Sequence, residues 1–271
     1  MRFLTCAAIL ISFTACVPAR PVAPKIVAPA RKISAQPQAL VAVAANPPQV
    51  TTREISGITL EGVAFDSRNH RLIVADQPGG PGSRFADAAT AAQSLGGLAA
   101  VNAGFFTPEG APLGLVASSG KISGSWNSAS SLGSAVWYQS KSGSSAIVRR
   151  DKLGRSAAAT MRELIQAGPL LVENGRAVGG LEATKTSART LVLWDGGSRW
   201  WLGYSSPCTL AALTQSLAAG TPTDWPIQQA LNLDGGRSSD LWISDAITGG
   251  PLLRRPPWNR PVRNFLILVS Q

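Results

Sequence analysis

Histidine and cysteine are scarce in this chain of 271 residues, which contains one histidine, His70, and three cysteines. It has no H-E-x-x-H, C-x-x-C or G-x-S-x-G motif. A zinc site built from several histidines is therefore excluded, and a Ser-His-Asp triad would have to use His70, which lies in a turn-forming D-S-R-N-H segment. The G-G-x-G fragments lack the helix and downstream acid of a nucleotide-binding loop. Carboxylates, arginines and amides remain as the groups that can carry chemistry.

Charged residues are also few, at 15% of the chain, and they are unevenly distributed. The first 50 residues contain five basic residues and no acid, whereas the other 221 contain 20 basic and 15 acidic residues. The net charge of +10 is better explained by a basic N-terminal segment followed by a mildly basic domain than by a nucleic-acid-binding surface. We therefore predict no nucleic-acid partner. With 45% hydrophobic residues, 27 glycines and 19 prolines, the body suits one domain of short elements joined by many turns.

The N-terminus has the features of an export signal. Arg2 precedes an apolar run, Phe3 to Phe13, that is too short to span a bilayer as a mature helix. The F-T-A-C sequence ending at Cys16 resembles a bacterial lipoprotein signal, in which the cysteine is acylated, although Phe13 stands where leucine is usual. We expect residues 1–16 to be a signal peptide of this type, with lipidation at Cys16. Ordinary cleavage close to Cys16 is the alternative.

Residues 17–50 are rich in proline, alanine and valine and contain no acid, so we expect an extended tether rather than a packed fold. Its positive charge favours anionic lipid headgroups, and a tail without a role is the alternative. The predicted location is exported, periplasmic or on the outer face of a bacterial membrane, with a lipid anchor at Cys16. Because Cys6 lies in the signal, Cys208 has no cysteine to pair with, and we expect it to be a buried apolar residue rather than a nucleophile.

From Thr51 onward, short apolar or alternating runs bounded by turn residues predict a strand-rich domain, residues 51–271. The expected strands are 58–65, 71–76, 98–102, 113–117, 135–138, 146–149, 170–173, 190–194, 199–204, 231–234 and 265–269. The expected helices are 85–95, 157–166 and 209–218. Because the helices do not alternate regularly with the strands, the pattern favours an α+β fold over a doubly wound parallel sheet. We expect a single domain with a strand-rich mixed sheet and a few helices.

Two motifs far apart in the sequence indicate where a site lies. The run A-L-N-L-D-G-G-R-S-S, Ala230 to Ser239, ends an apolar strand at the carboxylate of Asp234. Two glycines follow and let a ligand approach the main chain closely. The run V-N-A-G-F-F, Val101 to Phe106, likewise ends a strand at the amide of Asn102. Reactive groups are commonly held in this way, at the start of a loop on a rigid scaffold.

Five segments, in the same order along the chain, resemble the phosphodiester glycosidase family. They are N-A-G-F-F-T-P-E-G-A-P-L-G-L, A-G-P-L-L-V-E-N-G, A-R-T, A-L-N-L-D-G-G-R-S-S and the closing R-P-V-R-N-F-L. The resemblance spans Ile58 to the C-terminus and implies an α+β catalytic domain that hydrolyses the bond between a sugar's anomeric carbon and phosphate. The chain departs from the family's animal enzymes in lacking their cysteine-rich module and membrane-spanning tail. It also has Asn-Ala-Gly where they have Asn-Gly-Gly. Because of these departures, the resemblance implies the reaction class but not the identity of the substrate.

A phosphodiester carries a fixed negative charge, so we expect an arginine to grip its oxygens. Arg189, in the A-R-T segment, is the first candidate, Arg263 the second and Arg237 the third; a surface salt bridge is the alternative for each. Asp234 is the candidate for stabilising an oxocarbenium-like centre, attacking it or activating water, unless it only caps the Gly-Gly turn. Asn102 can bind a sugar hydroxyl or a phosphate oxygen, or only order its own turn.

Further residues are predicted to bind substrate around these groups: Gly104, Phe105, Phe106, Glu109, Gly235, Gly236, Ser238, Ser239 and Asn264. Phe105 and Phe106 can stack on a sugar ring or pack in the core. Glu109, Glu173 and Glu182 are candidates for a second carboxylate. Retention and inversion of configuration both stay open, because they depend on the separation of the two carboxyl groups.

Two functions of different class follow. The first is an exported hydrolase that cleaves a sugar-1-phosphodiester, with an N-acetylglucosamine-like or envelope glycan as its substrate. The second is a non-catalytic envelope lipoprotein that binds a sugar phosphate or glycan. The combination of Asp234, Arg189 and Asn102 favours the enzyme. We predict no cofactor, no metal site and no protein partner; the expected partners are the glycan and, through the lipid anchor, the membrane.

Overall fold

The computed structural model describes residues 46–271. The predicted signal peptide, Cys16 and almost all of the predicted tether lie outside the described residues, so those predictions stay predictions. The first strand, β1 (Gln49–Ile55), begins inside the predicted tether and pairs along its length with β2 (Ile58–Asp66). The predicted domain boundary at residue 51 therefore falls within β1.

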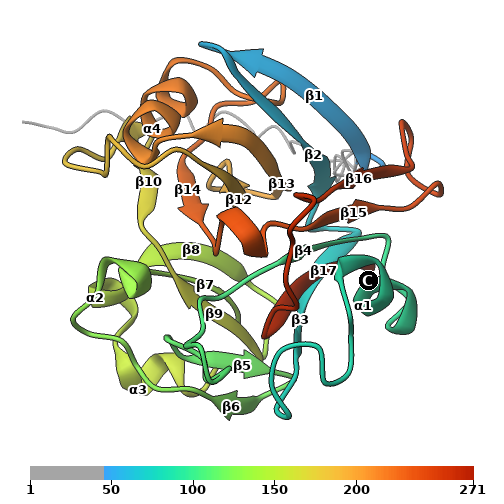
Figure 1. Cartoon of the computed structure of the whole chain (residues 1–271), viewed down its shortest axis with the longest axis vertical. Helices are drawn as coiled ribbons and strands as arrows, with labels where there is room; N and C mark the ends of the chain where they lie inside the picture. Colours follow the sequence, from blue (N-terminus) through green and yellow to red (C-terminus); the bar gives the residue numbers. More distant parts are fainter. Residues whose placement is uncertain (1–45) are drawn as a thin grey trace, which may run out of the picture. The chain divides into compact units, whose positions relative to one another are not determined.

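The strands of the described residues form three antiparallel sheets (Figure 1). The seven-stranded sheet has the order β1, β2, β13 (Arg199–Cys208), β12 (Ser187–Trp194), β14 (Gln229–Asn232), β10 (Leu170–Glu173) and β11 (Arg176–Ala177). One five-stranded sheet has the order β16 (Leu252–Arg254), β15 (Leu241–Ile243), β4 (Ala99–Asn102), β17 (Asn264–Ser270) and β3 (His70–Asp76). The other has the order β6 (Lys121–Ser123), β5 (Val116–Ser118), β9 (Glu163–Ala167), β7 (Ala135–Gln139) and β8 (Ser145–Arg149).

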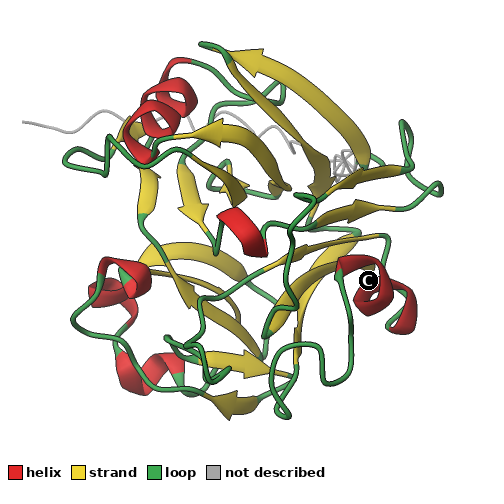
Figure 2. Ribbon diagram, in the orientation of Figure 1, coloured by secondary structure: helices red, strands yellow, loops and turns green. Residues whose placement is uncertain are grey.

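The three sheets share one hydrophobic core, and short helices cover their outer faces (Figure 2). Leu231, Leu266 and Ile165, one from each sheet, belong to the same buried cluster. The helices and 3-10 turns are α1 (Ala88–Ser94), η1 (Ser131–Gly133), α2 (Arg150–Leu153), α3 (Arg155–Ala158), α4 (Leu210–Ala219) and η2 (Gly236–Ser238). Burial on both faces explains why central strands such as β17 are nearly continuous apolar runs.

Local sequence signals set the ends of α1. The Asp87 side chain accepts the backbone N–H of Thr90 at 2.8 Å, and the Thr90 hydroxyl accepts the backbone N–H of Asp87 at 3.0 Å, which makes a capping box. Gly97 donates to the carbonyl of Ala92 and closes the helix. A side chain at Gly97 would meet Ile267 of β17 at 2.4 Å, so only glycine allows the chain to return this close to the sheet.

The predicted helix over residues 157–166 is wrong. The segment contains only the end of α3, and from Glu163 it is the strand β9, which lies between β5 and β7. All five residues of β9 are buried, because the strand is central in its sheet. The segment has apolar residues at helical spacing, namely Ala157, Ala158, Met161, Leu164 and Ile165, but tertiary packing overrides this local pattern.

The α+β fold class is confirmed, with strands dominant and the helices short. The expected strand over residues 113–117 forms later, as β5 at Val116–Ser118. Among residues 46–271, no helix has the length and apolar character needed to cross a membrane.

Candidate functional site

The two motifs that the sequence singles out meet at the ends of β4 and β14. The backbone N–H of Asp234, two residues beyond β14, donates to the carbonyl of Ala103, one residue beyond β4, at 2.9 Å. Ala103 in turn donates to the backbone carbonyl of Asn264 at the start of β17, at 3.0 Å. Three strand ends from two sheets therefore converge on the segment that contains Asp234.

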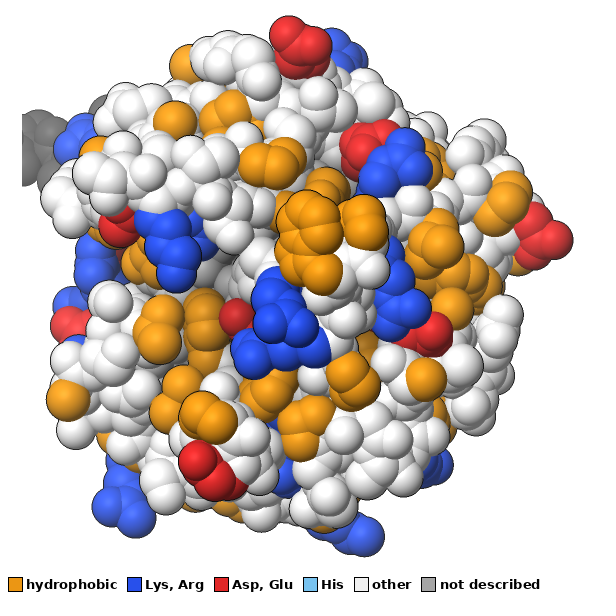
Figure 3. All heavy atoms as spheres, in the orientation of Figure 1, with side chains coloured by type: hydrophobic (Ala, Val, Ile, Leu, Met, Phe, Trp, Pro, Cys, Tyr) orange, Lys and Arg blue, Asp and Glu red, His pale blue; other side chains and the backbone are white. Residues whose placement is uncertain are grey.

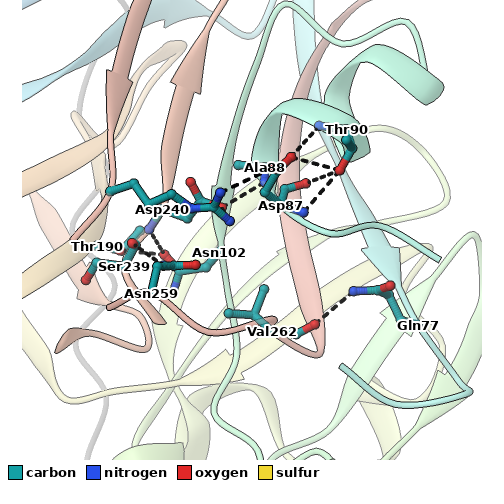
Figure 4. Close-up of polar contacts among 11 residues, drawn as sticks. Gln77, Asp87, Ala88, Thr90, Asn102, Thr190, Ser239, Asp240, Asn259 and Val262 are labelled. Atoms are coloured by element: carbon teal, nitrogen blue, oxygen red, sulfur yellow. Dashed lines mark hydrogen bonds and ion pairs between the residues drawn. The ribbon is translucent and has the colours of Figure 1, made fainter. Parts of the chain in front are cut away.

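Asn102 holds this junction together. Its side-chain Nδ2 donates to the backbone carbonyl of Asp234 at 2.7 Å, and its Oδ1 accepts the Thr190 hydroxyl at 2.7 Å and the backbone N–H of Asp240 at 3.0 Å. The side chain is fully buried. Figure 4 shows Asn102 between Thr190 and Asp240. Of the two roles predicted for Asn102, this geometry supports the ordering of the turn rather than contact with a ligand.

Asp234 is a buried carboxyl group with one oxygen left free. Its residue exposure is 8%, and Oδ1 accepts the backbone N–H of Gly235 at 2.9 Å. Oδ2 has no hydrogen-bond partner among the described residues. Burial raises the pKa of the Asp234 carboxyl, while Ser238, Arg260 and the Gly235 N–H act in the opposite direction. A buried acceptor without a partner costs free energy, so such an atom is a candidate for contact with a ligand.

Arg260 supplies the cation beside that free oxygen. Its guanidinium lies 4.0 Å from Oδ2 of Asp234, donates to the Ser238 hydroxyl at 3.2 Å, and stacks 4.7 Å above the ring of Phe106. Its side chain is 44% exposed, so it can reach a ligand in solvent. Sequence reasoning missed this residue, although it opens the R-P-V-R-N-F-L segment. Figure 3 shows acidic and basic side chains around a hollow near the middle of one face.

Arg189, the first predicted arginine, lies close to the same loop. It is half-buried, and its Nη2 donates to the backbone carbonyls of Lys185 at 3.0 Å and Cys208 at 3.4 Å. Its Nε is buried without a partner among the described residues, and burial lowers the pKa of the guanidinium. A side-chain carbon on Gly235 would meet Cδ of Arg189 at 3.4 Å. Among residues 46–271, no acid forms a salt bridge with Arg189. Its positive charge is therefore available to an anionic ligand.

Arg263 and Arg237 occupy other positions. Arg263 is 7% exposed, forms a two-point ion pair with Asp76 at 2.9 and 3.1 Å, and donates to the carbonyl of Gly110. These bonds engage its guanidinium inside the fold. Arg237 is exposed, and its Nε donates to the carbonyl of Trp258 at 3.2 Å.

Asn264 lies at the junction, and its side-chain amide has a hydrogen-bond donor without a partner in the described part of the chain. Its Oδ1 accepts the backbone N–H of Gly104 at 2.7 Å, while its buried Nδ2 has no partner among residues 46–271. Asn232 of β14 has a similar surplus: its Nδ2 donates to the carbonyl of Gly168, and its Oδ1 is unpartnered. Asn232 lies two residues before Asp234, a spacing that puts both side chains on one face of an extended chain. That spacing within A-L-N-L-D is the signal by which sequence reasoning could have found Asn232.

The glycine and serine residues after Asp234 shape the loop. A side chain at Gly235 would meet the carbonyl of Ala188 at 2.8 Å, and Gly236 has a positive φ of 62°. The Ser238 hydroxyl accepts from Arg260, and the Ser239 hydroxyl donates to the carbonyl of Ala188 at 3.4 Å. Both serines are buried, so their first role is to fix η2.

The other carboxylates named from the sequence do not contact Asp234. Glu109 is exposed, and a hydrogen bond with Thr107 lowers its pKa. Glu173 pairs with Arg149 at 2.7 Å, and Glu182 caps a turn by accepting the N–H of Lys185 at 2.6 Å. Asp240 is linked to Asp234 through Asn102, which accepts the backbone N–H of Asp240 and donates to the backbone carbonyl of Asp234.

The other residues considered from the sequence, Cys208, His70, Phe105 and Phe106, all described in the structure, form no hydrogen bond or ion pair with Asp234. Cys208 is buried, as predicted, and burial raises the pKa of its thiol. His70 begins β3, and burial lowers the pKa of its ring. Phe105 and Phe106 are partly buried, and Phe106 forms the stacking surface for Arg260. Within the described range, no group of three or more histidine, cysteine and acidic side chains is placed to hold a metal ion.

The fold and this site define an α+β protein in which a buried carboxyl group lies at converging strand ends, with Arg260 beside it and Arg189 close to the loop that follows. The model of the phosphodiester glycosidase family matches residues 95–269, more than half of the chain, and the protein belongs to this family. No curated protein matches the sequence.

Two solved structures show a similar fold. The catalytic domain of zebrafish N-acetylglucosamine-1-phosphodiester alpha-N-acetylglucosaminidase, auto-inhibited by its pro-peptide, is 19% identical, with a TM-score of 0.54 over 84% of this chain and 83% of that one. A hypothetical protein from Synechocystis is 17% identical, with a TM-score of 0.57 over 83% of this chain and 62% of that one, so this chain spans less than two thirds of it. At these identities the likeness concerns the fold alone.

Proposed function

We propose that this protein is an exported hydrolase that cleaves the bond between the anomeric carbon of a sugar and phosphate in a sugar-1-phosphodiester. Membership of the phosphodiester glycosidase family supports the reaction class. The zebrafish structure of similar fold carries the name of an enzyme acting on N-acetylglucosamine-1-phosphodiesters, which supports an N-acetylglucosamine-like sugar. The lipoprotein-type signal ending at Cys16 supports action on envelope glycans from a membrane anchor.

The observation that carries the proposal is the free Oδ2 of Asp234 beside Arg260. The carboxylate oxygen and the guanidinium are 4.0 Å apart and share no hydrogen bond, so each keeps hydrogen-bonding capacity for a bound group. A sugar-1-phosphodiester offers both halves: an anomeric carbon that becomes positive in the transition state and a phosphate that is always negative.

In the proposed reaction, Asp234 acts in its ionised form. It either attacks the anomeric carbon, forming a glycosyl ester that water then hydrolyses, or removes a proton from a water that attacks the carbon directly. The bond from carbon to the bridging oxygen breaks, and its electron pair leaves with the phosphate monoester. Phosphate is a stable leaving group, so a second carboxyl group is not needed as an acid. Arg260, and Arg189 through its free Nε, stabilise the charge that develops on the phosphate oxygens.

The test is release of free sugar from UDP-N-acetylglucosamine and a panel of sugar-1-phosphodiesters by the full-length protein, with and without chelator. Asp234→Asn keeps the size of the side chain and should abolish release. Asp245→Asn, at an exposed acid outside the site, is the matched control and should retain it. Saturable binding without release by the unaltered protein would overturn the enzyme and favour the glycan-binding alternative.

A further inference from the structure

A groove of about 510 Å³ begins where the Asp234 loop ends. It is lined by Thr186, Ser187, Ala188, Tyr204, Pro207, Gly236, Arg237, Arg255, Pro256, Pro257 and Trp258. Gly236 is two residues from Asp234, and the backbone N–H of Arg260 donates to the carbonyl of Arg237 at 3.1 Å. The groove therefore lies next to the place where Arg260 meets the substrate phosphate.

An exposed aromatic surface marks the groove. Trp258 is 65% exposed, the largest exposed fraction among the big apolar side chains of the described residues. Its loop is nevertheless braced: Arg237 donates to the Trp258 carbonyl at 3.2 Å, and Asn259 donates to the carbonyls of Pro256 at 3.0 Å and Ser239 at 2.9 Å. A large aromatic ring held open to solvent on a fixed loop is a surface on which a sugar ring can stack.

The charge of the groove fits an anion. No acidic residue lines it. Arg255 pairs with Asp87 at 3.2 Å and Asp240 at 3.4 Å, whereas Arg237 has no acidic partner among the described residues. The hydroxyls of Thr186 and Ser187 add groups that can hydrogen-bond to a sugar. The lining has no Asn or Gln amide to read a nucleobase edge, which favours a carbohydrate over a nucleoside.

From the stacking surface, the unpaired cation and the contact with the Asp234 loop, we propose that this groove is the subsite for the leaving group, and that it selects a sugar ring carrying a second phosphate. The substrates would then be glycans whose sugars are joined by phosphodiesters. This inference rests on the proposed function. Hydrolysis consumes one water, leaves the free sugar with an anomeric hydroxyl, and releases the rest of the chain as a phosphate monoester whose first ring lies on Trp258.

The test compares two diesters of N-acetylglucosamine-1-phosphate, one with a methyl leaving group and one with a second N-acetylglucosamine ring that bears its own methyl phosphodiester. We expect kcat/KM of the full-length protein to be roughly tenfold higher for the longer diester, the scale of one good stacking contact. Trp258→Ala should bring the ratio close to one. Leu253→Ala, at an exposed apolar residue outside the groove, should leave the ratio unchanged.

Arg237→Gln tests the charge independently. It should lower kcat/KM for the longer diester but not for an analogue whose second ring lacks phosphate. Equal rates for the two diesters, or the same ratio in Trp258→Ala, would overturn the subsite and leave the proposed function standing. A loss confined to UDP-N-acetylglucosamine in Trp258→Ala would assign the groove to a nucleobase instead. If neither diester is cleaved, the proposed function fails and the subsite fails with it.

Discussion

At the scale of single residues, two arginines three positions apart in one motif have different tasks. Arg260 is half-exposed beside Asp234, whereas Arg263 is buried in its pair with Asp76. We expect Arg260→Gln to lower kcat/KM roughly 10- to 100-fold, the scale of a charge-assisted hydrogen bond, with little change in melting temperature. Arg263→Gln should cost about 3–5 kcal/mol of unfolding free energy, because it leaves a buried carboxylate unpaired. Steady-state kinetics and urea unfolding of both variants check the contrast.

The raised pKa of Asp234 predicts the pH dependence of activity. Because the ionised form acts, kcat/KM should fall as the pH decreases, with a midpoint above the ordinary carboxyl value of 3.8. Arg260 favours the ionised form, so Arg260→Gln should move that midpoint to higher pH. A pH–rate profile of both proteins measures it. A midpoint at or below 3.8, or a shift to lower pH, would contradict the assignment.

The raised pKa of Asp240 predicts how the free energy of unfolding depends on pH. Burial raises the pKa of its carboxyl to about 6, and one oxygen, Oδ1, has no partner in the described residues. The unfolded chain ionises this group near 3.8, so the folded state loses stability as the pH rises from about 4 to about 6. The loss is on the order of 3 kcal/mol.

Asp240→Asn removes that titration, and the variant should gain stability relative to the natural chain between those pH values. Its amide oxygen can still accept the N–H of Ala88, which the carboxylate accepts at 2.8 Å. Urea unfolding of both proteins across the range isolates the difference from the other titrating groups. An unchanged difference in unfolding free energy with pH would show that Asp240 does not titrate there.

At the scale of elements, Gln166 in β9 ties a strand to two loops. Its Oε1 accepts the N–H groups of Leu115 and Asn127 at 3.0 and 2.9 Å, and its Nε2 donates to the carbonyls of Asn127 and Gly133 at 2.8 and 2.9 Å. Gln166→Ala should cost about 3 kcal/mol, because buried polar groups lose their partners. Gln93→Ala, exposed on α1, should change the unfolding free energy by less than about 0.5 kcal/mol. Denaturant unfolding compares the two.

The elements also show what sequence could predict. Strands such as β17 and β4 follow from apolar runs bounded by turn residues, whereas the expected helix over residues 85–95 begins too early, because the Asp87 cap starts α1 at Ala88. The segment that contains β9 reads as helix in sequence, because its apolar residues recur at helical spacing and the pairing of β9 with β5 and β7 forms only in the assembled sheet. The short edge strand β16 carries too few residues for any period to appear.

The same limit applies to the candidate site. The sequence singles out Asp234 as a candidate, because a polar residue that ends an apolar strand before two glycines is unusual along the chain. The choice between Arg260 and Arg263 could not be made, because it depends on which side of the chain faces Asp76 in β3. Asn102 looks reactive in sequence, but its hydrogen bonds to Thr190 and Asp240 appear only once the sheets are assembled.

At the scale of the whole molecule, three antiparallel sheets around one core bring strand ends that are more than a hundred residues apart to one place. The resulting site has a buried carboxyl group, a half-exposed arginine and an open groove next to them. Each part is positioned by backbone bonds between loops that follow different strands. We therefore expect activity to be lost together with the global fold, rather than in a separate local transition.

The most direct test of the central claim is to identify the bond that breaks, by running the reaction in water labelled with ¹⁸O and weighing both products by mass spectrometry. Attack at the anomeric carbon places the label in the released sugar and none in the phosphate monoester, which is the predicted result. Label in the phosphate would show that the bond between phosphorus and oxygen is cleaved, and would contradict the role assigned to Asp234.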